Sequence, residues 1–213
     1  MGSEMCIRDS DDSALGEDVV KKLKNHKVNT DYVMTMPGGM GTWLAVFDHN
    51  GDLAGSISQR PNLMPILGLL EEKGDEIFAN ADSVIVEVDM DKDIIKKVVA
   101  LAKQYNKKLY GVVSNMSIAV ERRDFLKHFD CFICNQLEAG MLFMEDYADK
   151  SPEELRDILS KRVILGKIPA MIVTMGGNGA VYADVNGEKG ICPPQRVRVK
   201  DCLLYTSDAA DDT

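Results

Sequence analysis

Short apolar runs alternate with amphipathic segments along most of this chain. From about residue 82 onward, apolar runs predict buried strands over 83–88, 109–113, 131–134 and 170–174. The segment 91–105 between two of these runs is amphipathic, and its apolar residues recur at helical spacing. Strands and helices that alternate over short connections predict a mostly parallel sheet with helices on both faces. The pattern therefore predicts an α/β fold.

Weaker patterns complete the predicted secondary structure. The capping box Ser151-Pro152-Glu153-Glu154 begins a helix, because proline favours the first helical position and glutamate the third. The other predicted elements are a helix over 17–26, a strand over 31–36, a helix over 64–73, a connector over 77–80, a helical or irregular segment over 118–128, and short strands over 180–183, 190–192 and 197–199.

A hairpin is predicted in the first third of the chain. Two apolar runs, 42–47 and 53–58, flank the sequence Asp48-His49-Asn50-Gly51-Asp52. Asn-Gly between two such runs favours a tight hairpin, because both residues tolerate positive φ. We expect a small antiparallel β lid within about residues 31–60, separate from the main sheet.

Composition and charge restrict the class of protein. The chain has 213 residues, 45% of them hydrophobic and 28% charged, which is typical of a soluble globular domain. Its net charge of −9 argues against nucleic acid or anionic membranes as partners. We find no apolar run long enough to span a bilayer and no signal-peptide pattern, and we expect a cytoplasmic protein.

The cysteines do not predict a disulfide framework or a metal site. They number five, at Cys6, Cys131, Cys134, Cys192 and Cys202, with irregular spacing. A Cys-x-x-Cys pair can be redox-active or half of a metal site, but this pair falls within an apolar strand, and no second pair completes a zinc site. We favour a structural role for both buried cysteines.

Polar residues and glycines follow the predicted strands, where ligands bind in open α/β sheets. Glu87 and Asp89 lie at the end of one predicted strand, and Ser114 and Asn115 follow the next. Two strand ends are richest in candidate chemistry. Asn135 and Glu138 follow the strand 131–134, and Thr174 ends the strand 170–174 just before Gly176, Gly177 and Gly179.

These two strand ends fit phosphate chemistry. Glycines let backbone N–H groups approach an anion closely, and Thr174 and Asn135 can donate to phosphate oxygens. Mg²⁺ binds a few carboxylates and keeps water ligands, so Glu138 can hold it. Each feature also has a plain structural explanation. The glycines can form a simple tight turn, and an acidic residue is favoured in the first turn of any helix.

Together these residues resemble the PfkB (ribokinase-like) carbohydrate and nucleoside kinases. Asn135-Gln136-Leu137-Glu138 is similar to the family's Asn-x-x-Glu motif, and the segment 173–180 is similar to its Thr-x-Gly-x-x-Gly nucleotide turn. The resemblance extends over about residues 16–201, and the stretch 41–48 is most similar to pseudouridine kinases. It implies a three-layer sandwich with a β lid. It also implies ATP and Mg²⁺ as cofactors, a sugar or nucleoside as acceptor, and pairing of two subunits through the lid.

The resemblance fails at both ends of the chain. The family's Asp-Thr-x-Gly-Ala-Gly-Asp motif, which supplies an anion hole and the catalytic base, would begin at Asp201, but Cys202 and a dissimilar tail follow. Segments 1–10 and 202–213 resemble non-native tails. We therefore predict a partial kinase domain over 11–201, incomplete at both ends and inactive by itself because the base is absent.

Two other functions compete with this interpretation. A non-catalytic nucleotide sensor on the same scaffold would also keep the nucleotide turn and lack the base. A dinucleotide-binding oxidoreductase is disfavoured, because no Gly-x-Gly-x-x-Gly follows the first strand of a βαβ unit.

Overall fold

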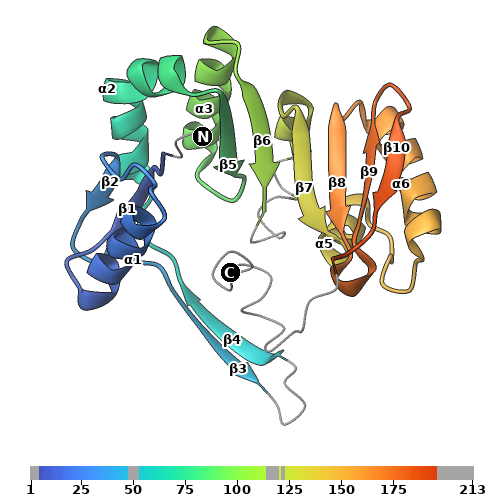
Figure 1. The fold of residues 1–213 in the computed structure, drawn as a ribbon, viewed down its shortest axis with the longest axis horizontal. Helices are drawn as coiled ribbons and strands as arrows, with labels where there is room; N and C mark the ends of the chain where they lie inside the picture. Colours follow the sequence, from blue (N-terminus) through green and yellow to red (C-terminus); the bar gives the residue numbers. More distant parts are fainter. Residues whose placement is uncertain (1–4, 48–52, 114–119, 121–122, 196–213) are drawn as a thin grey trace. The chain divides into compact units, whose positions relative to one another are not determined.

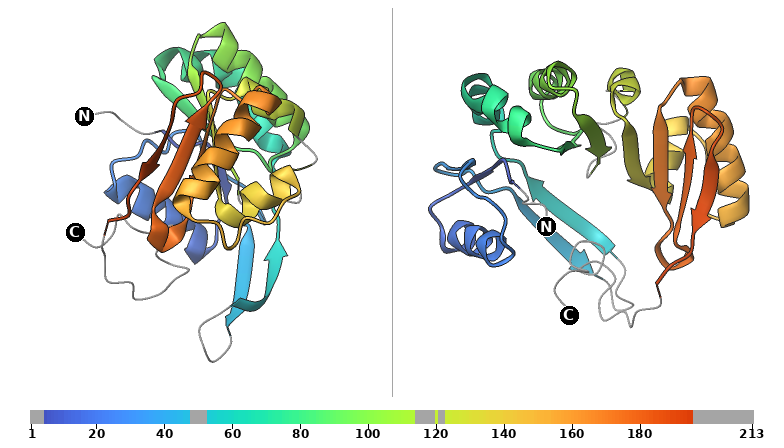
Figure 2. Two further views of the ribbon diagram at one scale, coloured as in Figure 1. Left: turned by 90° about the vertical axis from the view of Figure 1, so that its right-hand side faces the viewer. Right: turned by 45° about the horizontal axis from the view of Figure 1, so that its top comes forward.

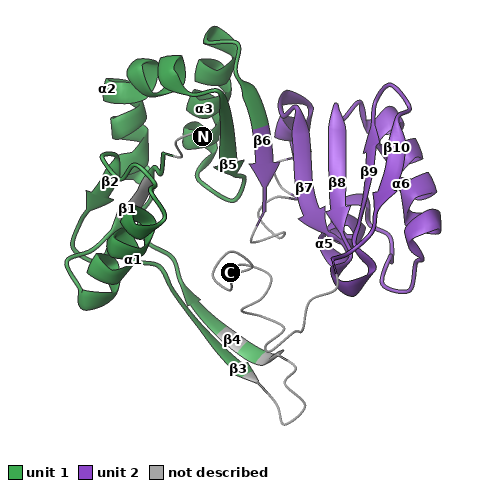
Figure 3. Ribbon diagram, in the orientation of Figure 1, with its two compact units in different colours: residues 1–109 green, residues 110–213 purple. Residues whose placement is uncertain are grey.

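The computed structural model describes residues 5–47, 53–113, 120 and 123–195 (Figure 1). The chain divides into two compact units, residues 1–109 and 110–213 (Figure 3). Unit 1 contains β1 (Arg8–Ser10), α1 (Ala14–Asn25), β2 (Val33–Thr35), β3 (Thr42–Phe47), β4 (Leu53–Gln59), α2 (Met64–Asn80), β5 (Ser83–Glu87) and α3 (Lys92–Gln104). Unit 2 contains the 3₁₀ helix η1 (Arg123–His128), β7 (Cys131–Asn135), α5 (Gln136–Phe143), α6 (Pro152–Gly166), β8 (Ala170–Thr174), the 3₁₀ turn η2 (Gly176–Asn178), β9 (Ala180–Asp184) and β10 (Lys189–Cys192). Strand β6 (Lys108–Val112) spans the boundary between the two units.

The main sheet is a mixed, mostly parallel sheet of six strands in the order β10-β9-β8-β7-β6-β5. The pairs β6–β7 and β7–β8 are parallel, whereas β8–β9 and β9–β10 are antiparallel. The predicted strand 170–174 is confirmed at both ends, and the predicted strands 83–88, 109–113 and 131–134 agree to within one residue at each end. The predicted strand 197–199 lies outside the described residues.

Helices α5 and α6 pack against the strands of unit 2. Helix α6 lies along β8, β9 and β10, and α5 contacts β7 and β8 (Figure 2). The core of this unit is apolar and closed to solvent. The strands and α6 supply these buried side chains: Phe132, Met171, Val173, Val181, Leu155, Leu159 and Val163. Burial of these side chains supplies most of the free energy that holds the helices on the sheet.

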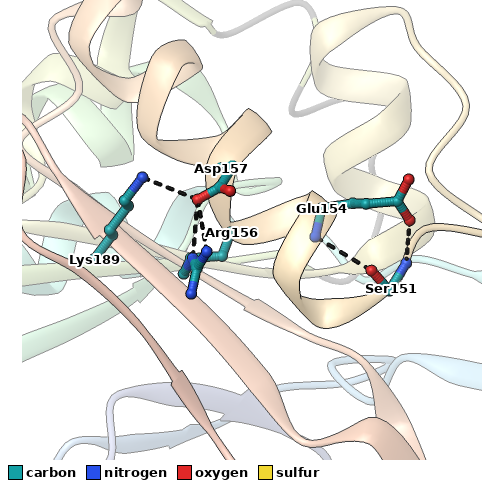
Figure 4. Close-up of polar contacts among 5 residues, drawn as sticks. All are labelled: Ser151, Glu154, Arg156, Asp157 and Lys189. Carbon is teal, nitrogen blue, oxygen red and sulfur yellow. Dashed lines mark hydrogen bonds and ion pairs between the residues drawn. The ribbon is translucent and has the colours of Figure 1, made fainter.

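Helix α6 begins with the predicted capping box. The Ser151 hydroxyl accepts a hydrogen bond from the Glu154 amide at 3.3 Å, and the Glu154 carboxylate accepts one from the Ser151 amide at 2.9 Å (Figure 4). Two amide groups that the helix itself leaves unpaired are therefore satisfied.

Helix α2 is longer than predicted. It runs unbroken over Met64–Asn80, so the predicted connector at 77–80 is wrong. Gly74 lies inside this helix and is buried. A Cβ at Gly74 would lie 2.6 Å from Cδ1 of Leu101 on α3. This glycine therefore allows α2 and α3 to pack closely and does not end the helix.

The predicted hairpin is confirmed as the two-stranded antiparallel sheet β3–β4, with Leu44 opposite Ile57 and Trp43 opposite Ser58. Its turn, residues 48–52, lies outside the described residues. The hairpin, α2 and β5 all belong to unit 1 (Figure 3).

The first described residues are also paired. Strand β1 runs parallel to β2, and the Ser10 side chain is fully buried. Sequence periodicity does not indicate this strand, and its pairing with 33–35 is long-range. The origin of segment 1–10 remains a prediction. None of the helices in the described part of the chain is long and apolar enough to cross a membrane.

Candidate functional site

The turn from β7 into α5 holds the predicted Asn-x-x-Glu pair. Asn135 is the last residue of β7 and the N-cap of α5. Its side-chain oxygen accepts a hydrogen bond from the Glu138 amide at 2.8 Å, and the Glu138 carboxylate Oε2 accepts one from the Asn135 amide at 2.7 Å. The motif therefore forms a second capping box, which fixes both side chains at the carboxyl end of β7.

The end of β8 lies beside the end of β7. Asn135 and Thr174 are register partners on these parallel strands, which places their backbones about 4.8 Å apart. Both side chains are exposed, and the Thr174 hydroxyl is 3.5 Å from the Cys134 carbonyl, at the long limit of a hydrogen bond. The two predicted strand ends are thus brought together at one edge of the sheet.

The glycine-rich segment forms the turn between β8 and the antiparallel β9. The Met175 amide donates to the Gly179 carbonyl at 2.8 Å, and the Asn178 and Gly179 amides each donate within the turn at 3.0 Å. None of the backbone hydrogen bonds in this described turn uses the amides of Gly176 or Gly177. Both residues are exposed, so their N–H groups are available to an anion.

The glycines have different structural roles. Gly176 has a φ of +52° and Gly179 a φ of +86°, and such positive values favour glycine. A Cβ at Gly179 would lie 2.2 Å from the Cys192 carbonyl oxygen, whereas a Cβ at Gly176 or Gly177 would meet no atom within 4 Å. Gly179 therefore lets the turn pack against the end of β10 and the residues that follow it, and the other two glycines leave the outer side of the turn open.

Glu138 is the carboxylate of this site. No group of three or more His, Cys, Asp or Glu side chains that would hold a metal is found in the described ranges. A cation bound mainly by phosphate oxygens and water needs only one or two carboxylates from the protein. The donor set at the end of β7 fits that kind of metal binding.

Gln136 is a site residue that sequence reasoning missed. Its side-chain amide donates to the carbonyls of Tyr147, Ala148 and Lys150, at 3.2 Å for Ala148 and 3.3 Å for Lys150. These bonds tie the segment after α5 to the start of that helix. Gln136 occupies a variable position of the Asn-x-x-Glu motif, and no local sequence signal indicates its long-range partners.

The two buried cysteines behave as structural residues. Cys131 and Cys134 are free thiols in β7, and burial raises the pKa of each. A raised thiol pKa disfavours the reactive thiolate. The redox or metal half-site is not supported.

Two other strand ends are predicted to carry polar residues. Asp89, in unit 1, is paired with Arg60, and Ser114 and Asn115 lie outside the described residues. A groove of about 550 Å³ in unit 1 is lined by Ser10, Gly16, Lys21 and Thr35 among others, and by none of the predicted site residues.

Comparisons with known proteins relate the chain to carbohydrate and nucleoside kinases. A family model described as "pfkB family carbohydrate kinase" matches residues 11–202. The chain is 34% identical over 177 residues to a guanosine-inosine kinase from Exiguobacterium acetylicum, covering 80% of this chain and 55% of that protein. It is 22% identical over 204 residues to a ribokinase from Schizosaccharomyces pombe, covering 95% and 61%.

The fold is also found in solved structures. A ribokinase from Giardia lamblia superposes with a TM-score of 0.72 at 13% identity, covering 92% of this chain and 62% of that one. This similarity establishes a ribokinase-like α/β fold. The chain spans between half and two thirds of the length of the curated relatives it matches.

Proposed function

The chain belongs to the pfkB family of carbohydrate kinases, and we propose that its intact parent transfers the γ-phosphoryl group of ATP to a hydroxyl of a sugar or nucleoside. The juxtaposition of Asn135 and Thr174 beside a turn with two unused amides supports this proposal most directly. Phosphoryl transfer depends on positioning and on offsetting the negative charge of the phosphates, and this edge of the sheet offers donors for both purposes.

Each residue has a proposed role in ATP binding. The amides of Gly176 and Gly177 donate to phosphate oxygens, and Asn135 and Thr174 add side-chain donors beside them. Gly179 keeps the turn in the required shape. Glu138 holds Mg²⁺ directly or through water, and the ion offsets phosphate charge.

The acceptor is proposed as a sugar or nucleoside. The 34% identity to a guanosine-inosine kinase favours a nucleoside, and the resemblance of 41–48 to pseudouridine kinases points to the same class. We place the protein in the cytoplasm. Its acidic net charge argues against nucleic acid and anionic membranes as partners.

The parent is also proposed to pair through its lid. Leu44, Val46 and Ile57 lie on one face of the β3–β4 hairpin and are each more than half exposed. An exposed apolar face on a two-stranded sheet favours association. Sedimentation of the parent at high concentration tests this pairing, and a monomer would contradict it.

The 213-residue chain itself is proposed to be inactive. After Asp201 its sequence lacks the Gly-Ala-Gly-Asp that supplies the catalytic base in the family it resembles. We expect no ATP-dependent phosphorylation of ribose, inosine, guanosine or pseudouridine by this chain. Product formation would refute the proposed inactivity. A longer gene that continues with that motif would identify the parent as a kinase, and a natural end near Asp201 would favour the nucleotide-sensor alternative.

The nucleotide site is tested with two matched substitutions. Glu138→Gln and Glu154→Gln each alter the glutamate of a capping box, and glutamine also functions at that position. We expect similar stability for both variants in urea unfolding. In calorimetric titration with Mg²⁺ and ATP, Glu138→Gln should bind more weakly by about tenfold, as for the loss of one charged contact, while Glu154→Gln should match the wild type.

The outcomes separate the roles of the two boxes. Equal ATP affinity in both variants would exclude Glu138 as a metal-binding residue. A wild-type chain that binds no ATP at millimolar concentration would contradict the nucleotide site as a whole.

A further inference from the structure

Arg60 connects the base of the hairpin to the end of β5. It directly follows β4 and lies before α2, which begins at Met64. Its Nη2 atom is 2.8 Å from Oδ2 of Asp89, and its Nη1 atom is 3.5 Å from the backbone carbonyl oxygen of the same residue. The planar guanidinium therefore faces two oxygens of one residue, a geometry that a lysine ammonium cannot reproduce.

Asp89 is a buried anion. Its side chain is 8% exposed, whereas that of Arg60 is 45% exposed. The second carboxylate oxygen, Oδ1, is buried and has no hydrogen-bond partner among the described residues. A buried carboxylate that loses its cation is strongly destabilised, so the pair couples the two segments more tightly than a surface ion pair does.

Other contacts make the base of the hairpin compact. A Cβ at Gly41, just before β3, would lie 3.1 Å from Cδ of Pro61, just after Arg60. The two ends of the hairpin therefore lie side by side at its base. Asn62 then accepts a hydrogen bond from the Met64 amide at 3.1 Å, which orders the entry into α2.

We propose that the Arg60–Asp89 ion pair is a positioning pair that fixes the direction of the β3–β4 hairpin relative to the carboxyl end of β5. Ligands of open α/β sheets bind beyond the carboxyl ends of strands, so the pair fixes the hairpin at the strand end where an acceptor would bind. The link to acceptor binding rests on the proposed function, whereas the effect of the pair on the hairpin does not.

The chain carries a native probe for this proposal. Trp43 is its single tryptophan and lies in β3 opposite Ser58, close to the base of the hairpin. The indole is 53% exposed. Time-resolved fluorescence anisotropy of Trp43 separates the slow tumbling of the unit from faster motion of the hairpin on the nanosecond scale.

The test compares two variants of the pair with a control. In Asp89→Asn and Arg60→Met, we expect the amplitude of the fast component to rise at least about twofold as the hairpin gains nanosecond freedom. Arg60→Lys should be intermediate. Lys96→Met removes a cation from the exposed ion pair with Asp93 on α3 in the same unit, and should leave the decay unchanged.

Arg60→Met leaves the buried Asp89 carboxylate without its cation, whereas Asp89→Asn leaves no unpaired buried charge. Asp89→Asn therefore decides the result if Arg60→Met does not fold. An unchanged decay in folded Asp89→Asn would overturn the proposal, and so would an equal change in Lys96→Met. In an active parent, Asp89→Asn should raise the KM for the acceptor and leave the KM for ATP unchanged. If the KM for the acceptor is unchanged while the Trp43 effect is present, the proposed link to the acceptor is rejected and the positioning role of the pair stands.

Discussion

The substitution Gly179→Ala isolates the structural role of the glycine turn from its proposed role in nucleotide binding. Gly179 has φ +86° and ψ −133°, a region that residues with a Cβ rarely adopt. An alanine Cβ would also lie 2.2 Å from the Cys192 carbonyl oxygen and 2.9 Å from the Pro194 nitrogen. Both neighbours are backbone atoms, so a side-chain rotation cannot relieve the overlap.

The magnitude follows from these two terms. A residue held in a disfavoured φ/ψ region costs about 1–3 kcal/mol. Inserting a methyl group into a filled space costs a further 1–3 kcal/mol or so. Alanine recovers only about 0.4–1 kcal/mol by restricting the unfolded chain. We therefore expect Gly179→Ala to lower the free energy of unfolding of unit 2 by about 3 kcal/mol.

Gly177→Ala is the matched control, two positions away in the same turn. A Cβ there would meet no atom within 4 Å, and the residue has no positive φ. Its free energy of unfolding should stay within about 1 kcal/mol of the wild type. Urea unfolding followed by far-UV circular dichroism, with the m-value compared, measures both variants. Equal stabilities for the two variants would refute the assignment of Gly179 as the residue that packs the turn.

Two further predictions concern ionisable groups. Hydrogen bonds from Arg156 and then Lys189 lower the pKa of Asp157 from 3.8 to about 2 (Figure 4). Because the folded-state pKa is lowered, the contribution of Asp157 to stability is complete above pH about 4 and is lost as the pH falls through about 2. The difference in melting temperature between wild type and Asp157→Asn should therefore shrink over that range. A difference that stays constant would contradict this prediction. Burial raises the pKa of the Cys134 thiol. Iodoacetamide at neutral pH should therefore modify the exposed Cys192 and spare Cys134 until urea is added, as mapped by mass spectrometry. Equal labelling of the two cysteines in the native chain would contradict this prediction.

Local sequence signals predicted most of the fold. The strand 170–174 and the hairpin follow from apolar runs and an Asn-Gly turn, because both depend on neighbouring residues. The predicted end of the helix at residue 73 and the connector at 77–80 were wrong. Gly74 has low helix propensity by itself, but in α2 it packs against Leu101, which is distant in sequence. Strand β1 was missed for the same reason, as its partner β2 lies more than twenty residues away.

The candidate site was predicted in part. The sequence places Asn135 and Thr174 at strand ends, and their pairing in register follows from the order of parallel strands. The contacts of Gln136 and the Arg60–Asp89 pair could not be predicted, because each joins segments whose distance depends on tertiary packing. A charge near a strand end indicates neither its partner nor its burial.

We propose that position in the fold gives the two capping boxes different functions. Asn135–Glu138 and Ser151–Glu154 make the same reciprocal hydrogen bonds, and both satisfy helix amides in the same way. Hydrogen-bond geometry alone would give them equal roles. The first box lies beside Thr174 at the carboxyl end of a parallel strand, next to the glycine turn, whereas the second begins α6 after the segment 144–150. Helix N-termini favour anions, but a phosphate group needs several donors that converge. Because the glycine amides supply further donors beside the first box, a substitution there should affect nucleotide binding while the same substitution in the second box should not.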